Sequence, residues 1–413
     1  MSDAIENAAL TTPRTVVVIG GGQAAGWVVK TLRTEGFEGR LVMIADEVHL
    51  PYERPPLSKG VLAGEADIET VRIAKPDEFA TLNVETWQPD CAVAIDRTKR
   101  TVTTRSGREV KYDRLVIATG GAARRLPASV AKSAHVTYLR TLDEALALGE
   151  RLRRSQRVLV VGGGWIGLEV AATARKLGVA ATVIEGAPRL CARSLPQEVA
   201  DFLLELHRAN GVDVRLNSAL VSLEDREEGG VRATFADGST LDADFAVAGI
   251  GLTPNTALAQ EAGLAVEDGI VVDEFGETSD ADIFACGDVA NHPNAWLKRR
   301  VRLESWANAQ NQAIAAAKAV LGVKAPYAEI PWFWSDQYDV NLQILGDLPA
   351  GLTPVLRGSL DEKRVTLFFV EDGHLRGVIA INAARDLKLA RKWMNQGRAV
   401  DVAALVDTSK ALA

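Results

Sequence analysis

The sequence predicts an α/β protein with two doubly wound parallel sheets and a smaller C-terminal α+β domain. Three observations support this fold. Apolar strands run directly into glycine-rich turns and helices at two places, residues 15–33 and 157–177. After residue 323 the pattern changes to an aromatic segment followed by alternating strands. The chain has 413 residues, which suffices for two or three domains.

The first of these stretches carries a fingerprint for phosphate binding. Residues 16–19 are apolar and β-branched, which predicts a buried strand, and residues 27–33 predict a helix. Between them Gly20, Gly22 and Ala25 form the pattern G-x-G-x-x-A. The first glycine permits a tight turn, the second lets backbone N–H groups approach a pyrophosphate, and the alanine lets helix and strand pack closely. The helix N-terminus then offers N–H donors to the phosphates.

Acidic residues follow the next predicted strand, residues 41–44. Asp46 lies roughly twenty residues beyond Gly22, where a carboxylate accepts hydrogen bonds from an adenosine ribose. Glu47 is adjacent, and spacing alone does not choose between the two.

The sequence between the two stretches predicts a stiff loop and, after it, a small antiparallel excursion, that is, a short antiparallel sheet outside the main one. Two prolines after Arg54 predict that residues 50–59 form a rigid segment and not the start of a helix. Arg54 and Lys59 on such a loop suit phosphate charge or a polarised ring, or they are solvated charges. Residues 84–111 predict the excursion, and a buried strand then returns to a small-residue turn ahead of Arg124.

The second stretch holds an intact G-x-G-x-x-G fingerprint at Gly162, Gly164 and Gly167. Glu185 ends the following strand, roughly twenty residues later, which completes the signature of a dinucleotide site. A carboxylate about 4 Å from a 2′-phosphate would repel it by roughly 4 kcal/mol at intermediate dielectric, so this site predicts NADH over NADPH. Arg189 is close enough in sequence to offset that preference. Two fingerprints in one chain predict electron transfer between two dinucleotides.

The remaining segments complete the prediction. Residues 283–288 place Asp288 at the carboxyl end of a strand, where ligands of open α/β sheets bind, or at the N-cap of a following helix. In the C-terminal domain, Trp332 and Trp334 taken alone predict core packing. A helix is expected over residues 384–394.

Composition excludes several classes of function. The net charge of −7, with no Lys/Arg-rich block, argues against nucleic-acid binding. No run of about 18 apolar residues predicts a membrane span. The first dozen residues predict a loose tail without the apolar core of a signal peptide. The three cysteines, Cys91, Cys191 and Cys286, form no C-x-x-C and no metal site by local spacing, so they predict buried thiols in a reducing cytoplasm.

Taken together, these motifs resemble the FAD-dependent pyridine nucleotide-disulfide oxidoreductases. Within them, the chain is most similar to the NADH:ferredoxin reductases of bacterial oxygenase systems, the putidaredoxin reductase and biphenyl-dioxygenase reductase type. The segments that carry the resemblance are Arg54-Pro-Pro-Leu-Ser-Lys59, Ala118-Thr-Gly-Gly121, Gly162 to Glu169, Cys286-Gly-Asp288 and Pro331-Trp-Phe-Trp-Ser-Asp-Gln337. Ala25 departs from relatives that keep a third glycine.

The resemblance implies a glutathione-reductase-like arrangement and specific roles for residues. The FAD-binding domain would be discontinuous (residues 1–118 and 247–322), the NADH-binding domain would span 119–246, and the C-terminal domain 323–413. The catalytic pair would be Lys59, near flavin N5, and Glu169, near the nicotinamide. The residues expected to hold FAD are Gly20, Gly22, Ala25, Asp46, Arg54, Lys59, Arg124, Gly287, Asp288, Trp306 and Trp334. The residues expected to hold NADH are Gly162, Gly164, Gly167 and Glu185.

The absent C-x-x-C implies that electrons leave the flavin directly. The expected acceptor is a [2Fe–2S] ferredoxin, Rieske-type or plant/adrenodoxin-type, that serves a terminal oxygenase of aromatic hydrocarbon catabolism. Two surfaces are expected to dock it, residues 298–302 and the basic side of the helix at 384–394, or each is an ordinary solvated face. The alternatives are a flavoenzyme that reduces a small molecule directly, and an NADH-responsive interaction protein resembling apoptosis-inducing factor.

Overall fold

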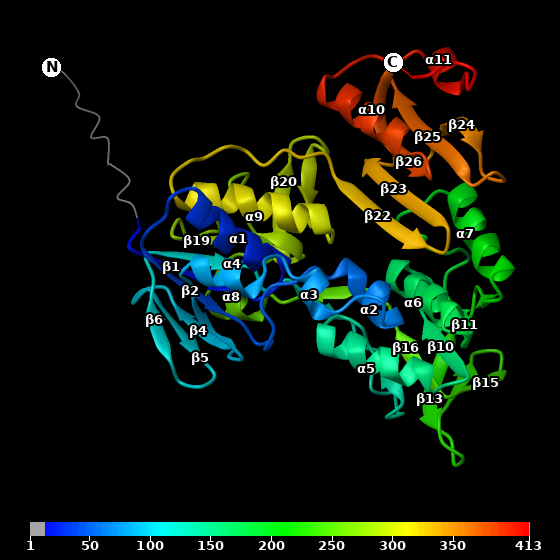
Figure 1. Cartoon of the computed structure of the whole chain (residues 1–413), viewed down its shortest axis with the longest axis horizontal. Helices are drawn as coiled ribbons and strands as arrows, with labels where there is room; N and C mark the ends of the chain where they lie inside the picture. Colours follow the sequence, from blue (N-terminus) through cyan, green and yellow to red (C-terminus); the bar gives the residue numbers. More distant parts are fainter. Residues whose placement is uncertain (1–12, 413) are drawn as a thin grey trace. The chain divides into compact units, whose positions relative to one another are not determined.

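The computed structural model describes residues 13–412 (Figure 1). The predicted loose tail, residues 1–12, lies outside the described residues. By its internal contacts the chain divides into two compact units. The first comprises residues up to 53 together with 72–121 and 254–329, and the second comprises 54–71, 122–253 and 330–413.

A five-stranded parallel sheet organises the first unit, in the order β19-β7-β1-β2-β3. Its strands are β1 (Thr15–Ile19), β2 (Arg40–Ile44), β3 (Glu85–Trp87), β7 (Arg114–Ile117) and β19 (Ile283–Ala285). β1 is central because Val16 pairs with Leu41 on one side and with Arg114 on the other. The predicted strands at 16–19 and 41–44 are confirmed. β19, from late in the sequence, belongs to the same sheet as the first glycine turn.

Two helices of the first unit pack against each other, α1 (Gln23–Thr34) and α9 (Trp306–Val320), as Figure 1 shows. α1 contains the helix predicted at 27–33. The buried face of α9 consists mainly of alanines, and Ala313 and Ala317 are fully buried. Small side chains allow the two helix backbones to approach closely. α9 therefore supports α1, the helix that follows the glycine turn.

The predicted antiparallel excursion at residues 84–111 is wrong at its beginning. β3 pairs in parallel with β2 and so extends the main sheet, with Trp87 buried. Only the later part forms the antiparallel sheet β4-β5-β6. The other elements of the first unit are β4 (Ala92–Asp96), β5 (Thr101–Thr104), β6 (Glu109–Lys111), β18 (Ile270–Val271), β20 (Ala290–Asn294), β21 (Arg299–Val301), α4 (Pro76–Thr81) and α8 (Ala257–Glu261).

The second unit contains a second parallel sheet, in the order β12-β11-β10-β16-β9. Its strands are β9 (Val136–Thr137), β10 (Arg157–Val161), β11 (Ala180–Ile184), β12 (Asp213–Arg215) and β16 (Phe245–Ala248). Its helices are α5 (Leu142–Arg153), α6 (Trp165–Lys176) and α7 (Gln197–Ala209). An antiparallel sheet follows α7 and β12, formed by β13 (Leu220–Asp225), β14 (Val231–Phe235) and β15 (Thr240–Ala243). β8 (Gly121–Ala123) and β17 (Leu252–Pro254) form a two-stranded sheet.

The C-terminal part of the second unit is an antiparallel sheet in the order β22-β23-β26-β25-β24. Its elements are β22 (Trp332–Gln337), β23 (Val340–Gly346), β24 (Val355–Ser359), β25 (Arg364–Glu371), β26 (His374–Ile381), α10 (Ala384–Asn395) and α11 (Val402–Val406). The helix predicted at 384–394 is confirmed as α10, which packs on β26 and β23. The predicted strands are present, but β25 and β26 are buried along most of their length instead of alternating.

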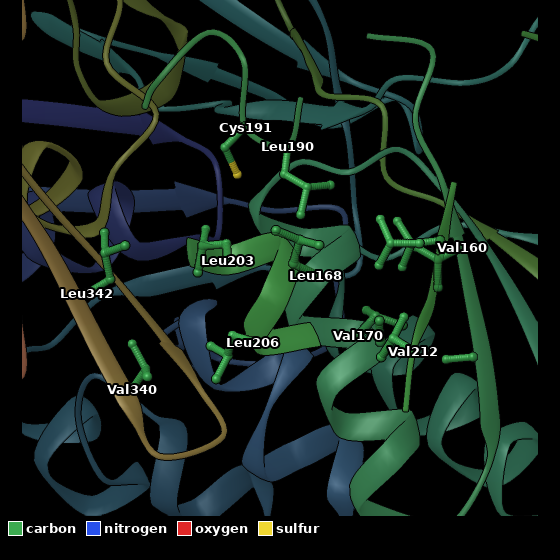
Figure 2. Packing of buried hydrophobic residues seen from close by; sticks show 14 of the residues in the cluster. Val160, Leu168, Val170, Leu190, Cys191, Leu203, Leu206, Val212, Val340 and Leu342 are labelled. Atoms are coloured by element: carbon green, nitrogen blue, oxygen red, sulfur yellow. The ribbon is translucent and has the colours of Figure 1, made fainter. Parts of the chain in front are cut away.

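One apolar core joins the C-terminal sheet to the helices of the second parallel sheet. Figure 2 shows Val340 and Leu342 of β23 in the same cluster as Leu203 and Leu206 of α7 and Leu168 of α6. These side chains are between 0% and 5% exposed. Burial of this kind contributes about 25 cal/mol per Å² of apolar surface. The C-terminal sheet is therefore fixed against α7, not tethered by a linker alone.

The segment 54–71 belongs to the second unit and is helical in short pieces. They are η1 (Pro55–Ser58), a 3₁₀ turn, followed by α2 (Gly60–Ala63) and α3 (Ile68–Val71). The prediction that no helix starts here is wrong, because both prolines lie in the first turn of η1, with Arg54 as the N-cap. A first turn needs no N–H donors from its own residues, so it accepts proline.

Candidate functional site

The first glycine turn has the geometry of a phosphate-binding loop. Gly20 has φ +130°, and a Cβ there would lie 2.3 Å from the carbonyl oxygen of Ala118. Its N–H donates to the Ile44 oxygen at 2.8 Å, which ties the turn to β2. Gly22 is the N-cap of α1 and supplies no side-chain cap. The first N–H groups of α1 are therefore available to an anion.

The turn that carries Asp288 lies against the beginning of α1. Gly287 has φ +79°, and a Cβ there would lie 2.9 Å from the Cβ of Ala24. The Gly287 N–H donates to Oε1 of Gln312 at 2.9 Å. The stretch after Asp288 is not the predicted helix: η2 (Gly287–Val289) is one 3₁₀ turn that leads into β20, and its N-cap is Cys286. The N-cap alternative for Asp288 is therefore wrong, because the N-cap lies two residues earlier and Asp288 stands inside the turn.

Unpartnered polar atoms at this place test whether a dinucleotide fits. Within residues 13–412, both amide atoms of Gln23, which is 7% exposed at the start of α1, have no hydrogen-bond partner, and neither does Nε2 of Gln312. A buried polar atom without a partner costs about 1–3 kcal/mol. These atoms flank the two turns, so a polar group between them would satisfy them, and the FAD assignment fits the residues present.

Trp306 begins α9, and its N-cap Ser305 accepts a hydrogen bond from the Asn308 N–H at 3.2 Å. Burial raises the pKa of the nearby Glu53 carboxyl, and its interaction with Trp306 opposes the rise. A carboxyl with a raised pKa beside a predicted flavin residue is a functional candidate. Sequence reasoning missed Glu53, which has no motif signal apart from its place beside Arg54.

The structure distinguishes the two acidic residues after β2. Glu47 accepts a hydrogen bond from the Tyr52 hydroxyl, whereas Asp46 is exposed. Ala45 occupies the position directly over the glycine turn, since a Cβ on Gly21 would lie 2.6 Å from its Cβ. These contacts favour Asp46 as the ribose ligand.

The second glycine turn is built in the same way, and its helix lies closer to the turn. Gly162 has φ +108° and donates its N–H to Ile184 at 2.8 Å. A Cβ on Gly167 would lie 2.1 Å from the Gly162 oxygen, so only glycine fits there. Gly164 is the N-cap of α6 without a side-chain cap. The N-terminus of α6 is therefore also open to an anion.

Glu185 is anchored beside this turn. Its carboxylate accepts hydrogen bonds from the N–H groups of Gly163 at 2.7 Å and Ala187 at 2.8 Å. Arg189, the residue that could offset the charge, donates from Nη2 to the Ala192 oxygen at 2.9 Å. The carboxylate is therefore fixed at the glycine turn, while the arginine is bound within its own loop.

Lys59 and Glu169 form a buried ion pair in the second unit. The Lys59 Nζ lies 2.8 Å from Glu169 Oε2, and the side chains are 22% and 4% exposed. Ser58 donates to the same oxygen at 2.5 Å, and Ser335 of β22 donates to Oε1 at 2.6 Å. The carboxylate thus accepts from three donors, one of which is a charged ammonium group.

Trp334 is half-buried, as is Trp332, so the core prediction for both is wrong. The two rings stack at 5.0 Å, and Arg391 lies 5.1 Å from the centroid of Trp332. Side chains alternate along a strand, so the tryptophans face away from the side on which Ser335 meets Glu169.

Four of the residues expected at the flavin belong to the second unit: Arg54, Lys59, Arg124 and Trp334. Arg54 donates from Nη1 to the Arg140 oxygen at 2.5 Å, and Arg124 donates from Nη2 to the Leu252 oxygen at 3.3 Å. The structure brings Lys59 and Glu169 together directly. It brings Gly20, Gly22, Ala25, Gly287 and Asp288 together within the first unit.

The cysteines do not form a dithiol. Cys91, Cys191 and Cys286 are all free; the last two are buried and Cys91 is partly exposed, against its prediction. Burial raises the pKa of the Cys286 thiol to about 12 and that of Cys191 further, so both remain protonated at neutral pH. Among residues 13–412 no group of three or more metal-ligating side chains comes together. No helix in that range is long and apolar enough to cross a membrane.

The two expected basic surfaces differ in the structure. Arg302 has only 9% side-chain exposure and is paired with Asp268 and Glu304, and Arg300 donates to two carbonyl oxygens. In this surface the charge of Arg302 is therefore neutralised and that of Arg300 is held against backbone oxygens, whereas residues 298–300 are exposed. On α10, by contrast, Arg385, Lys388 and Lys392 are exposed at helical spacing along one face.

These features define an oxidoreductase with two dinucleotide sites and no redox dithiol. The chain belongs to the pyridine nucleotide-disulphide oxidoreductase family, whose model matches residues 14–313, and a reductase C-terminal family model matches residues 332–413. Members of the first family use FAD and a pyridine nucleotide, so the predicted family, fold and cofactors, FAD and NADH, are confirmed at the level of the family.

Several characterised proteins are similar over nearly their whole length. The ferredoxin–NAD(+) reductase component of the anthranilate 1,2-dioxygenase system of Burkholderia cepacia is 38% identical, covering 96% of this chain and 98% of that protein. The ferredoxin reductase for the CYP199A2 system of Rhodopseudomonas palustris matches with a TM-score of 0.91 and 37% identity over 96% of this chain and 98% of that one. The reductase in the covalent putidaredoxin reductase–putidaredoxin complex matches with a TM-score of 0.91 and 37% identity over 96% of each chain.

Proposed function

We propose that this chain is an FAD-dependent NADH:ferredoxin reductase that serves a bacterial oxygenase system. The observation that carries the proposal is the relation, 38% identical across 96% of this chain, to a reductase component of such a system. The absence of C-x-x-C from the sequence supports it, because electrons then have no disulfide to enter. When bound, FAD supplies the chemistry by accepting a hydride and releasing electrons one at a time.

The site residues take the following proposed roles. The first glycine turn, with Asp46 and Asp288, holds FAD, and the second turn, with Glu185, holds NADH. Lys59 and Glu169 act as a charged pair near the reacting rings, where they orient and polarise without forming a bond. The three-domain division expected from the sequence stays a proposal, since division by contacts gives two units.

The proposed partner is a [2Fe–2S] ferredoxin, two molecules of which are reduced per NADH, and the proposed compartment is the cytoplasm. The basic face of α10 is the surface proposed to receive the ferredoxin, because ferredoxins of this kind are usually acidic. Electrostatic complementarity of this type speeds association and weakens with salt.

Stopped-flow spectroscopy on the purified yellow protein tests the proposal. NADH should bleach the flavin rapidly and NADPH slowly, and a [2Fe–2S] ferredoxin mixed in next should be reduced at a rate that falls as salt rises. Rapid bleaching without transfer to any of several ferredoxins would instead support direct reduction of a small molecule. Slow bleaching with a persistent long-wavelength absorbance would support the interaction protein.

A further inference from the structure

A chain of buried polar side chains leads away from Glu169 inside the second unit. Ser335 Oγ lies 2.6 Å from Glu169 Oε1, and Gln337 Nε2 lies 3.0 Å from that hydroxyl. The Gln337 Oε1 lies 2.7 Å from His207 Nε2, and His207 Nδ1 lies 3.2 Å from the Tyr338 hydroxyl. Ser335, Gln337 and His207 are each no more than 3% exposed. These buried side chains are therefore one another's hydrogen-bond partners.

The charge on Glu169 fixes which atom donates and which accepts in every hydrogen bond of this series. An ionised carboxylate only accepts, so the Ser335 hydroxyl must donate to it. That hydroxyl has one hydrogen, so its oxygen must accept from the amide nitrogen of Gln337. The amide oxygen of Gln337 then faces His207, whose Nε2 must carry the hydrogen.

The neutral state of His207 fixes the direction of the last hydrogen bond, the one to Tyr338. It lies in α7 with no exposed surface, and burial lowers its pKa. A neutral imidazole has one donor and one acceptor nitrogen. With the hydrogen on Nε2, the Nδ1 accepts from the Tyr338 hydroxyl, whose pKa burial raises and which therefore keeps its proton.

We propose that Ser335, Gln337 and His207 are positioning residues for Glu169, and that the charge of Glu169 sets the tautomer of His207 through them. Ser335 and Gln337 lie in β22, within the region matched by the reductase C-terminal model. That region would then help to hold the Lys59–Glu169 pair at the hydride-transfer site, in addition to providing the basic face of α10. The catalytic part of this inference rests on the proposed function; the tautomer part does not.

Replacing Glu169 by Gln should reverse the whole chain. Lys59 and Ser58 both donate to Oε2, so the amide oxygen of the new side chain must take that position. Its NH₂ group then points at Ser335, whose hydroxyl turns to donate to Gln337. Gln337 flips, its NH₂ group donates to His207 Nε2, and the hydrogen of His207 moves to Nδ1.

Histidine ring ¹⁵N NMR on the FAD-loaded, oxidised protein tests this, because ring-nitrogen shifts distinguish the two tautomers. The chain has five histidines, and the His207 signal is identified by its loss in His207→Gln. We expect the Nε2–H tautomer in the wild type and mainly the Nδ1–H tautomer in Glu169→Gln. The matched control, Glu224→Gln, removes an exposed carboxylate paired with Lys132 at 2.8 Å in the same unit and should change nothing. A wild-type Nδ1–H tautomer, or no change in Glu169→Gln, would overturn the proposal.

Ser335→Ala gives a second test of the path. In that background Glu169→Gln should no longer move the His207 signal, and a persisting change would show that the chain is not the link. In stopped flow, Ser335→Ala should slow flavin bleaching by NADH about tenfold, because a hydrogen bond to a charged group is lost, and Ser335→Thr should restore the rate. Unaltered bleaching in Ser335→Ala would refute the positioning role. Failure of NADH to bleach the wild type would refute the proposed function and leave the tautomer result standing.

Discussion

The two glycine turns share one backbone device. In each, the N–H of the first glycine donates at 2.8 Å to the last residue of the neighbouring strand, Gly20 to Ile44 and Gly162 to Ile184. In each, the second glycine begins a helix without a side-chain cap. The fingerprint therefore fixes the turn and the open helix end, and it does so equally in both units.

The third position of the fingerprint separates the two turns. A Cβ on Gly167 would lie 2.1 Å from the oxygen of Gly162, whereas the Ala25 methyl group is accommodated with no exposed surface. The first helix thus stands further from its turn than the second. The alanine at position 25 therefore reflects a wider spacing between helix and turn, and the rest of the fingerprint keeps its geometry.

The residues just outside the fingerprint differ most. Two positions after Ala25 stands the half-buried Trp27, with Lys30 5.1 Å from its ring centroid, whereas two positions after Gly167 stands Glu169, which is 4% exposed. The same turn therefore presents an aromatic ring in one unit and a buried charge in the other. The comparison teaches that the motif places a dinucleotide and its neighbours decide the chemistry.

Removing the cation of the buried pair is the largest change we expect. Lys59→Met leaves the Glu169 charge uncompensated, which should cost about 3 kcal/mol of unfolding free energy, the lower end for a buried pair because Lys59 is partly exposed. Flavin bleaching by NADH should also slow markedly. Lys132→Met, which breaks an exposed pair with Glu224, should cost less than about 1 kcal/mol. Chemical denaturation and stopped flow measure both effects, and equal costs would show that the pair at Glu169 is not special.

Exchanging the third fingerprint residues tests the difference in spacing. Gly167→Ala should destabilise the protein by about 2 kcal/mol and weaken NADH binding, because the new methyl group collides with backbone. Ala25→Gly should cost about 1–2 kcal/mol, from helix propensity and from the loss of one buried methyl group. Denaturation with and without NADH measures both. A harmless Gly167→Ala would mean that the two turns have the same spacing after all.

Neutralising the anchored carboxylate should give the smallest effect. Glu185→Gln keeps an acceptor for the Gly163 N–H and removes the charge. Because Glu185 is partly exposed, solvent screens the repulsion to less than its value at intermediate dielectric, so the affinity for NADPH relative to NADH should rise about tenfold, or about 1.4 kcal/mol. Glu224→Gln removes one charge from the same unit and should leave the ratio unchanged. Titration calorimetry with both nucleotides measures it. A ratio that stays constant in Glu185→Gln would assign the preference to another residue.

Local patterns predicted most of the fold. The strands at 16–19 and 41–44, both glycine turns and the helix at 384–394 follow from periodicity and turn chemistry within short windows. The errors arose where tertiary pairing decides the outcome. β3 joined the main sheet because β2 had a free edge. The strands β25 and β26 became buried because α10 packs on β26 and because both strands contribute to the apolar core that includes α7.

The site was predictable only as far as its motifs reach. The Lys59–Glu169 pair was expected from the resemblance. Ser58, Ser335 and Gln337 lie in segments that carry the resemblance, but nothing in the sequence linked them to Glu169, and His207 carried no signal. Their bonds join residues more than 100 positions apart, except within β22. Single serines and glutamines at such separations have no periodicity or spacing that would single them out.

The membership of residues 54–71 in the second unit has a consequence for recombining relatives. The chain passes from one unit to the other after residues 53, 71, 121, 253 and 329, so neither unit is a continuous piece of the gene. A chimera cut between the two fingerprints would take Lys59 from one parent and its partners Glu169 and Ser335 from another. An exchange of nucleotide preference between relatives should therefore move 54–71 along with 122–253 and 330–413, so that charge and counter-charge are inherited together.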